Sequence, residues 1–137
     1  MFVMLLGSVV QAQGVQLQAQ VPFEFKVGEM ALPAGEYELT KLNIGGGTFR
    51  IRGEDAATLK VVMPVYSAEV KEDCVLVFNK YRENGGETSY FLSQIWVAGS
   101  TVGYTVAKSN AERAAAKRAA RRDVITLVVQ RANPRAE

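Results

Sequence analysis

The sequence predicts a mainly β protein, an antiparallel β-sandwich or partly open barrel of about eight strands with one α-helix in its C-terminal half. Three observations support this fold class. Residues 15–27 alternate apolar and polar or proline positions without a break, which is the period of a half-buried antiparallel strand. Shorter strand-like segments follow, separated by turn residues at intervals of about eight to twelve positions. Residues 109–122 are rich in alanine and arginine and have the composition of a helix.

The first strand is expected to place its odd-numbered side chains on the core and its glutamines in water. A strand this long and regular, with no charge on its apolar face, is expected to be a sheet edge that is paired, covered or used for association. The candidate association residues are Val15, Leu17, Val21, Phe23 and Phe25. Leu32-Pro33-Ala34-Gly35 is typical of a type I turn and is expected to fold the chain back.

Three further strands follow this turn. Residues 36–42 alternate through Tyr37 and Leu39, and a glycine-rich connection leads into residues 49–52. After a turn at 53–55, the residues Leu59, Val61, Met63 and Val65 share one face of the next strand, with Thr58 and Lys60 opposite. Pro64 cannot donate a backbone hydrogen bond, so it restricts the end of this strand to a sheet edge.

Residues 74–82 and 89–97 form the clearest hairpin. Asn84-Gly85 between two β-rich segments is a strong hairpin signal. Both segments carry large apolar residues on both faces, so they are expected to be central strands covered on two sides.

The helix is predicted at about 109–122, with a final strand at 124–131. Ser109 and Glu112 form a capping box, with serine at the N-cap and glutamate three residues later. Alanines occupy one half of the helix and basic residues the other. The basic candidates for contact with an anionic surface are Arg113, Lys117, Arg118 and Arg121.

Charge is segregated along the chain. The 137 residues suit one domain, and 48% hydrophobic with 22% charged residues is a globular composition. The formal net charge is only +2, yet residues 108–122 hold six Lys and Arg against one Glu. This segment is either a solvated face or a contact for lipid headgroups, polysaccharide or an acidic partner. Nucleic acid is an unlikely partner, because no aromatic residue interleaves the charges.

Residues 1–12 resemble the end of a secretory signal peptide, which leaves residues 13–137 as a single β-sandwich domain. The apolar segment 2–6 is followed by small residues, with Val10 and Ala12 at the positions that a signal peptidase reads. The alternative is a buried N-terminal strand or helix. A lone Cys74 forms no internal disulfide. We therefore expect an exported protein, periplasmic or extracellular, whose mature chain begins near residue 13.

The residue types present argue against the common catalytic and metal-binding arrangements. The chain has no histidine and one cysteine, which excludes a Ser-His-Asp triad, a Cys-His nucleophile and zinc sites built on histidine or thiolates. Neither a phosphate-binding loop nor a dinucleotide fingerprint is present. Glu36 and Glu38 have a spacing compatible with an inverting glycosidase, but a solvated face is preferred. Glu54 and Asp55 have too few oxygen neighbours in sequence for a calcium site. We expect no enzyme activity, cofactor or metal.

Four aromatic residues are candidates for ligand binding: Tyr81, Tyr90, Trp96 and Tyr104. Aromatic side chains on a hairpin usually pair across strands and fill a core. The alternative is a platform for a glycan or a hydrophobic ligand.

Five segments resemble a recurring set in small, uncharacterised exported β-proteins of acidobacterial type. They are Val21-Pro22-Phe23-Glu24-Phe25, Val27-Gly28, Leu32-Pro33-Ala34-Gly35-Glu36-Tyr37, Tyr90-Phe91-Leu92-Ser93-Gln94-Ile95-Trp96 and Lys108-Ser109-Asn110-Ala111-Glu112-Arg113. The resemblance covers roughly residues 21–113. It implies export and a β fold, and it carries no assigned activity or site residues.

Two functions follow as hypotheses. The leading one is an exported, non-enzymatic structural or interaction module of the bacterial envelope or extracellular space, which associates with itself or a protein partner through the strand 15–27. The alternative is a glycan- or lipid-binding protein with a pocket between sheet and helix, near Trp96 and Tyr104.

Overall fold

The computed structural model describes residues 15–42 and 47–132. Within them the chain forms one helix and a series of short strands, in this order: β1 (Gln16–Val21), β2 (Phe25–Val27), β3 (Met30–Leu32), β4 (Gly35–Leu42), β5 (Thr48–Arg52), β6 (Ala57–Val61), β7 (Met63–Tyr66), β8 (Cys74–Glu83), β9 (Thr88–Trp96), β10 (Val102–Thr105), α1 (Asn110–Arg118) and β11 (Ala119–Arg131).

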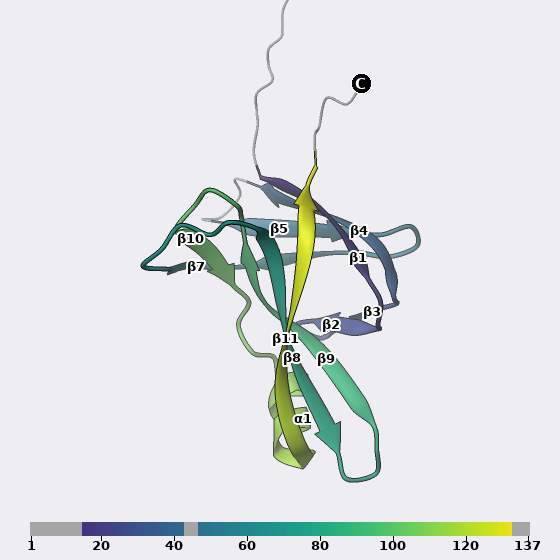
Figure 1. Cartoon of the computed structure of the whole chain (residues 1–137). Coiled ribbons are helices and arrows are strands. Elements are labelled where there is room, and N and C mark those ends of the chain that lie inside the picture. Colours follow the sequence, from purple (N-terminus) through teal and green to yellow (C-terminus); the bar gives the residue numbers. More distant parts are fainter. Residues whose placement is uncertain (1–14, 43–46, 133–137) are drawn as a thin grey trace, which may run out of the picture.

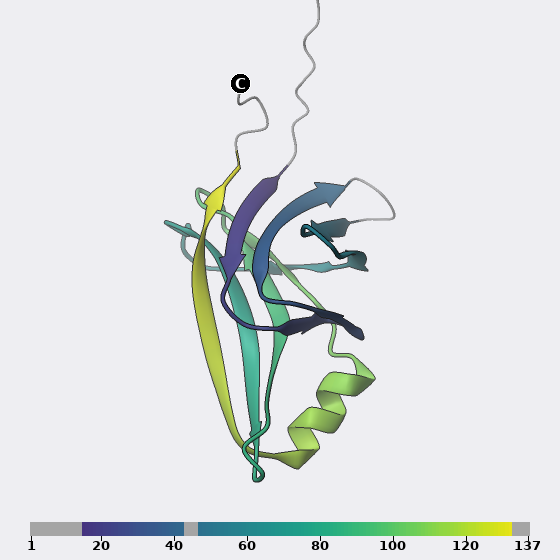
Figure 2. The ribbon, with the colours of Figure 1, turned by 90° about the vertical axis from the view of Figure 1, so that its right-hand side faces the viewer.

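The strands join in the order β3-β2-β9-β8-β11-β1-β4-β5-β6, with β10 beside β9 and β7 beside β10. The pairs are antiparallel except for β2 and β9, which meet in parallel at Lys26 and Phe91. The sheet curls into a nearly closed barrel, and the long strands β8, β9 and β11 extend from it toward α1 (Figures 1 and 2). The predicted fold class, a mainly β, partly open barrel with one late helix and a final strand, is confirmed.

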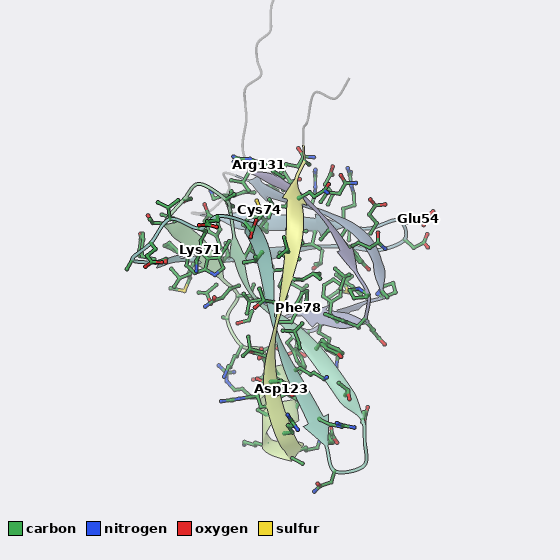
Figure 3. The ribbon with its side chains drawn as sticks, viewed as in Figure 1. Glu54, Lys71, Cys74, Phe78, Asp123 and Arg131 are labelled. Carbon is green, nitrogen blue, oxygen red and sulfur yellow. The ribbon has the colours of Figure 1, made fainter. Side chains whose placement is uncertain are left out.

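The core lies inside the barrel and centres on Phe78. Its ring, which is fully buried, meets Phe23 and Phe25 edge-on at centroid distances of 5.0 and 5.5 Å. Figure 3 places Phe78 partway along the long strands, between Cys74 and Asp123. Phe23 also stacks on Tyr90 at 3.8 Å. Edge-on and stacked aromatic pairs add to the free energy gained by burying their area, so this group holds the long strands to the start of the chain.

The predicted continuous strand 15–27 is wrong in its extent and its position. Pro22 has no N–H to continue the ladder, so the chain leaves β1 at Val21 and re-enters the sheet elsewhere as β2. A turn at Gly28 (φ +62°) leads into β3. This left-handed backbone favours glycine. Length and alternation alone did not reveal this short hairpin.

β1 is not an edge strand. It pairs with β4 over its whole length on one side and with β11 at Leu17 and Gln18 on the other. Of the five predicted association residues, Leu17, Val21 and Phe25 are buried, and Val15 and Phe23 are half-buried against the core. The strand fails as an association surface because its apolar face forms the barrel core and two other strands pair with its backbone.

The hairpin and the helix start are confirmed, and the helix end is corrected. β8 and β9 pair across the loop that holds Asn84-Gly85, and β8 lies centrally between β9 and β11. The Ser109 hydroxyl accepts a hydrogen bond from the Glu112 N–H at 3.1 Å. The helix ends at Arg118 rather than Arg122, because residues from Ala119 onward pair with β8. Sheet hydrogen bonds here override the helix propensity of alanine and arginine.

The predicted signal-peptide remnant, residues 1–12, lies outside the described residues, as does most of the glycine-rich connection at 43–47. Among the residues that the structure describes, none of the helical segments has the length and apolar character needed to cross a membrane.

Candidate interaction surfaces

β6 is the last strand of the sheet, and its apolar residues face solvent. Leu59 and Val61 are exposed by 59% and 62%, and Ala57 is exposed beside them. Thr58 and Lys60 lie opposite Ile51 and Phe49, which are buried in the core, and so share the inner face. We call Ala57, Leu59 and Val61 the β6 edge. The sequence predicts that Leu59 and Val61 share a face, but only the structure shows that this face lies outside.

The backbone of the β6 edge also points away from the sheet. The Val62 N–H donates to the Gly47 carbonyl at 3.2 Å, and the Ala56 carbonyl accepts from the Gly53 N–H at 2.7 Å. Successive residues of an antiparallel strand direct their backbone N–H and C=O groups to opposite sides of the strand. Because Ala56 and Val62 bond toward β5, Thr58 and Lys60 between them bond to β5 as well. Ala57, Leu59 and Val61 therefore direct their N–H and C=O groups to the free side, where none of the described strands pairs with them.

β3 and β7, the other end strands among the described residues, are protected, whereas the β6 edge is not. β11 also has a free side over residues 119–129, because β1 pairs with it only at Gln130 and Arg131. β3, at the opposite end of the sheet, has only three residues. β7 pairs with β10 alone among the described strands and contains Pro64. Short edges and proline are common protections against unwanted pairing. The exposed apolar character continues past the β6 edge to Met63, Tyr66 and Val70, which are exposed by 62%, 72% and 59%.

The four predicted ligand-binding aromatics do not form one site. Tyr90 stacks on Phe23 inside the barrel. Tyr104 meets Phe49 edge-on at 5.3 Å, and the Lys71 ammonium lies 4.6 Å from the centroid of the Trp96 ring.

Tyr81 lies apart from the other three, beneath α1. It is buried and meets the Phe91 ring at 5.8 Å, and both pack with Ala115. The predicted pocket between sheet and helix is thus filled by side chains at this point, and Trp96 and Tyr104 pack in other parts of the molecule.

The predicted basic surface is divided between two elements. Arg113, Lys117 and Arg118 are exposed on α1, but Arg121 lies on β11. Two of the four are paired with acidic neighbours: Arg118 with Glu83 at 3.0 Å and Arg121 with Asp123 at 3.2 Å. The guanidinium of Arg113 donates to the Asn110 side chain at 3.3 Å. These partners reduce the net positive field that the sequence suggests.

Glu112 has a role that the capping-box pattern does not predict. Its side chain is only 3% exposed, and among the described residues it is the one charged side chain that is buried. It accepts hydrogen bonds at 2.8 Å from the Asn79 amide and from the Tyr81 hydroxyl. A carboxylate of a capping box usually bonds back to the N-cap N–H, whereas this one fastens α1 to β8. The Ala111 N–H donates to Glu29 at 3.3 Å, which ties the helix to the β2–β3 turn.

The environment under the helix raises the pKa of Tyr81 to about 12. Burial of the phenol is the main cause, followed by its hydrogen bond to Glu112 and the negative charge of that carboxylate. Arg122, opposite Tyr81 on β11, acts in the other direction. The Tyr81 hydroxyl is therefore a stable donor to the buried carboxylate.

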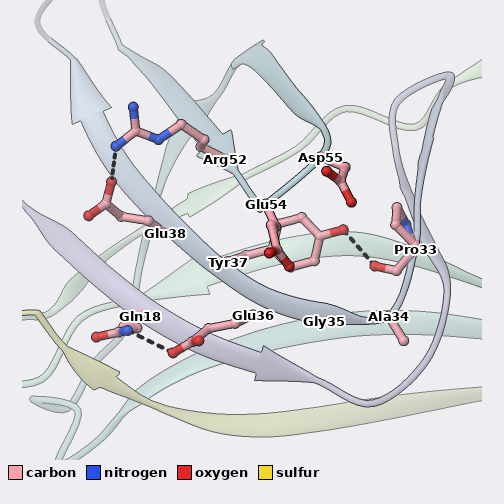
Figure 4. Close-up of a pocket in the computed structure, with 10 residues that line it drawn as sticks. All are labelled: Gln18, Pro33, Ala34, Gly35, Glu36, Tyr37, Glu38, Arg52, Glu54 and Asp55. Atoms are coloured by element: carbon pink, nitrogen blue, oxygen red, sulfur yellow. Dashed lines mark hydrogen bonds and ion pairs between the residues drawn. The ribbon is translucent and has the colours of Figure 1, made fainter.

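Both acidic pairs noted in the sequence line one open groove of about 490 Å³ (Figure 4). Glu36 and Glu38 come from β4, and Glu54 and Asp55 from the turn after β5.

The two β4 carboxylates in this groove already have partners. Glu36 accepts from Gln18 at 2.8 Å, and Glu38 accepts from Arg52 at 2.9 Å and from Gln16 at 2.6 Å. Among the described residues, no group of three or more acidic, histidine or cysteine side chains is arranged to hold a metal ion. The groove is thus a polar, partly neutralised surface.

Comparisons of this chain with protein-family models, with curated proteins and with solved structures found no match. The resemblance to exported β-proteins therefore stays a prediction.

Proposed function

We propose that this protein is an exported, non-enzymatic interaction module that binds a partner by strand addition at the β6 edge. The observation that carries this proposal is a five-residue edge strand with exposed apolar side chains and outward-directed backbone groups in the same three residues. In strand addition, the backbone hydrogen bonds supply affinity and alternate side chains supply specificity. The β6 edge offers both features.

Export is supported by the signal-like segment 1–12 and by the lone, buried Cys74. A non-enzymatic role is supported by the residue types already considered, since the chain has no histidine and one cysteine. Two of the four carboxylates of the acidic groove, Glu36 and Glu38, accept hydrogen bonds from neighbouring amide and guanidinium groups. The association surface predicted at 15–27 is therefore replaced by one at 57–61.

The proposal is tested in a bacterial host that produces the chain with its N-terminal segment. A photoreactive phenylalanine analogue is placed at position 59 or, as a matched control, at position 124. Val124 is an apolar residue exposed by 63% on β11, where the strand pairs with Asn79 of β8. We expect a discrete covalent adduct from position 59 and none from position 124, with the partner's attachment point in an extended segment.

Two results would overturn the proposal. The binding surface is wrong if position 59 gives no adduct, or gives the same adducts as position 124. The export claim is wrong if the protein stays in the cytoplasm, or if the intact mass of exported protein shows that Met1 is retained.

A further inference from the structure

We infer that the partner strand at the β6 edge is the β6 edge of a second copy, paired antiparallel about a two-fold axis at Leu59. This inference rests on the proposed function and names its partner. It makes one continuous sheet from two barrels. The interface is isologous, so the same patch serves both protomers and the assembly closes as a dimer.

The backbone directions determine which residues can face each other. Only Ala57, Leu59 and Val61 direct N–H and C=O groups to the free side. In a two-fold arrangement centred on Leu59, this residue lies opposite the partner's Leu59, and Ala57 lies opposite the partner's Val61. Each directly opposed pair exchanges two N–H···O=C hydrogen bonds. All three residues of the edge are then satisfied in both protomers.

Lys60 distinguishes this register from its neighbours. With the axis at Leu59, Lys60 lies opposite the partner's Thr58. If the axis moved to Lys60, the two Lys60 residues would lie directly opposite each other in a non-hydrogen-bonded pair, where the Cα atoms are only about 4.5 Å apart. If it moved to Thr58, Val61 would lose its partner.

Lys60 has a defined position within its own protomer. Its Nζ lies 2.7 Å from the point that a Cβ atom at Gly28 would occupy, so the side chain spans from β6 to the β2–β3 turn. Lys60 is thus the residue that we expect to set the register.

The side chains are compatible with a copy of the same strand. The outer face of β6 is apolar and uncharged, so two copies meet Leu to Leu and Ala to Val with no charge opposed. The neighbouring Arg52 is paired with Glu38 in its own protomer. Arg50, opposite Leu59 on β5, lies three strand spacings from the partner's Arg50. That separation is about 14 Å, beyond the distance at which exposed charges interact strongly in 0.1 M salt.

The first test measures the mass of the purified full chain by size-exclusion chromatography with light scattering over a range of concentrations. We expect a dimer that dissociates on dilution. Leu59→Lys places two lysines opposite each other at the axis and is expected to give a monomer with an unchanged circular dichroism spectrum. Val124→Lys makes the same chemical change at an equally exposed position and is expected to remain dimeric.

The second test locates the axis by disulfide cross-linking. Leu59→Cys is expected to form a covalent dimer, because directly opposed Cα atoms about 5.5 Å apart fit a disulfide. Val61→Cys alone is expected to form none, since its two copies are offset by four residues, about 13 Å. A mixture of Ala57→Cys and Val61→Cys should link. The native Cys74 is buried and does not compete.

The outcomes separate this inference from the proposed function. A parent protein that stays monomeric at every concentration overturns the second-copy assignment, and an adduct to a different protein at position 59 then leaves the proposed function standing. A dimer that survives Leu59→Lys, or that links through Val61→Cys alone, overturns the two-fold register.

Discussion

The bond between Tyr81 and Glu112 leads to a prediction about stability at high pH. Tyr81→Phe removes only the hydroxyl that donates to the buried carboxylate and leaves the ring packed on Phe91 and Ala115. Glu112 then keeps the Asn79 amide as its side-chain donor. A hydrogen bond to a charged group contributes about 1.5–3 kcal/mol, and a buried charge that loses a partner is costly. Near pH 8 we therefore expect the variant to be less stable than the parent by about 2 kcal/mol.

This difference should shrink as the pH rises. The pKa of Tyr81 is about 12 in the folded protein and 10.0 without these interactions. Between these values the unfolded chain has lost the phenol proton and the folded protein retains it, so the parent becomes less stable as the pH rises. The stabilisation from the protonated Tyr81 hydroxyl is fully present below pH 10 and is lost as the pH rises toward about 12. A pKa difference of this size corresponds to a loss of free energy of unfolding on the order of 3 kcal/mol in the parent. The phenylalanine variant has no phenol at this position and does not undergo this loss.

Urea unfolding of parent and variant, from about pH 8 to about pH 11.5, measures both effects. Tyr66→Phe serves as the control, because Tyr66 is 72% exposed and its change should leave the pH dependence as in the parent. The free energies of unfolding of the parent and Tyr81→Phe should converge at high pH. If the free energies of unfolding of parent and variant fall in parallel above pH 10, the buried environment does not raise the pKa of Tyr81 and the reasoning is refuted.

Three further changes test the packing and the surface. Gly103→Ala would place a Cβ atom 2.5 Å from ring carbons of Trp96 and should lower the free energy of unfolding, measured in urea, by about 1–3 kcal/mol. Gly85→Ala is the control, because Gly85 has open space around it, and it should cost much less. Equal costs for the two variants would contradict the packing argument. Phe23→Lys removes the ring that stacks on Tyr90 and should lower the free energy of unfolding by about 3 kcal/mol or more. An unchanged melting temperature would show that this ring does not hold the core together. Changing Arg113, Lys117, Arg118 and Arg121 together to glutamine loses only exposed ion pairs of about 0.2–1 kcal/mol each. Any salt-sensitive binding of the parent to acidic vesicles should disappear in that variant, and equal binding by both would rule out an anionic-surface role for these residues.

Local signals in the sequence determined much of the fold. Asn84-Gly85-Gly86 specifies the β8–β9 hairpin because these residues tolerate a tight turn, in which Gly86 takes the left-handed backbone (φ +90°). Ser109 specifies the helix start because its hydroxyl satisfies an otherwise unpaired N–H. The alternation of β1 correctly predicts that Leu17, Ala19 and Val21 share the core face. Each of these signals depends on a few neighbouring residues, so the sequence alone contains it.

Tertiary structure decided what each face meets and which strands become neighbours. Alternation shows that Leu17 shares a face with Val21, and Leu59 with Val61, but one pair is buried in the barrel and the other is exposed at the sheet edge. Burial depends on strand pairing between residues far apart in the chain, which a local pattern does not encode. The same cause ended the helix at Arg118 and turned Glu112 toward Tyr81, because β8 supplied hydrogen-bond partners that lie about thirty residues away in the sequence.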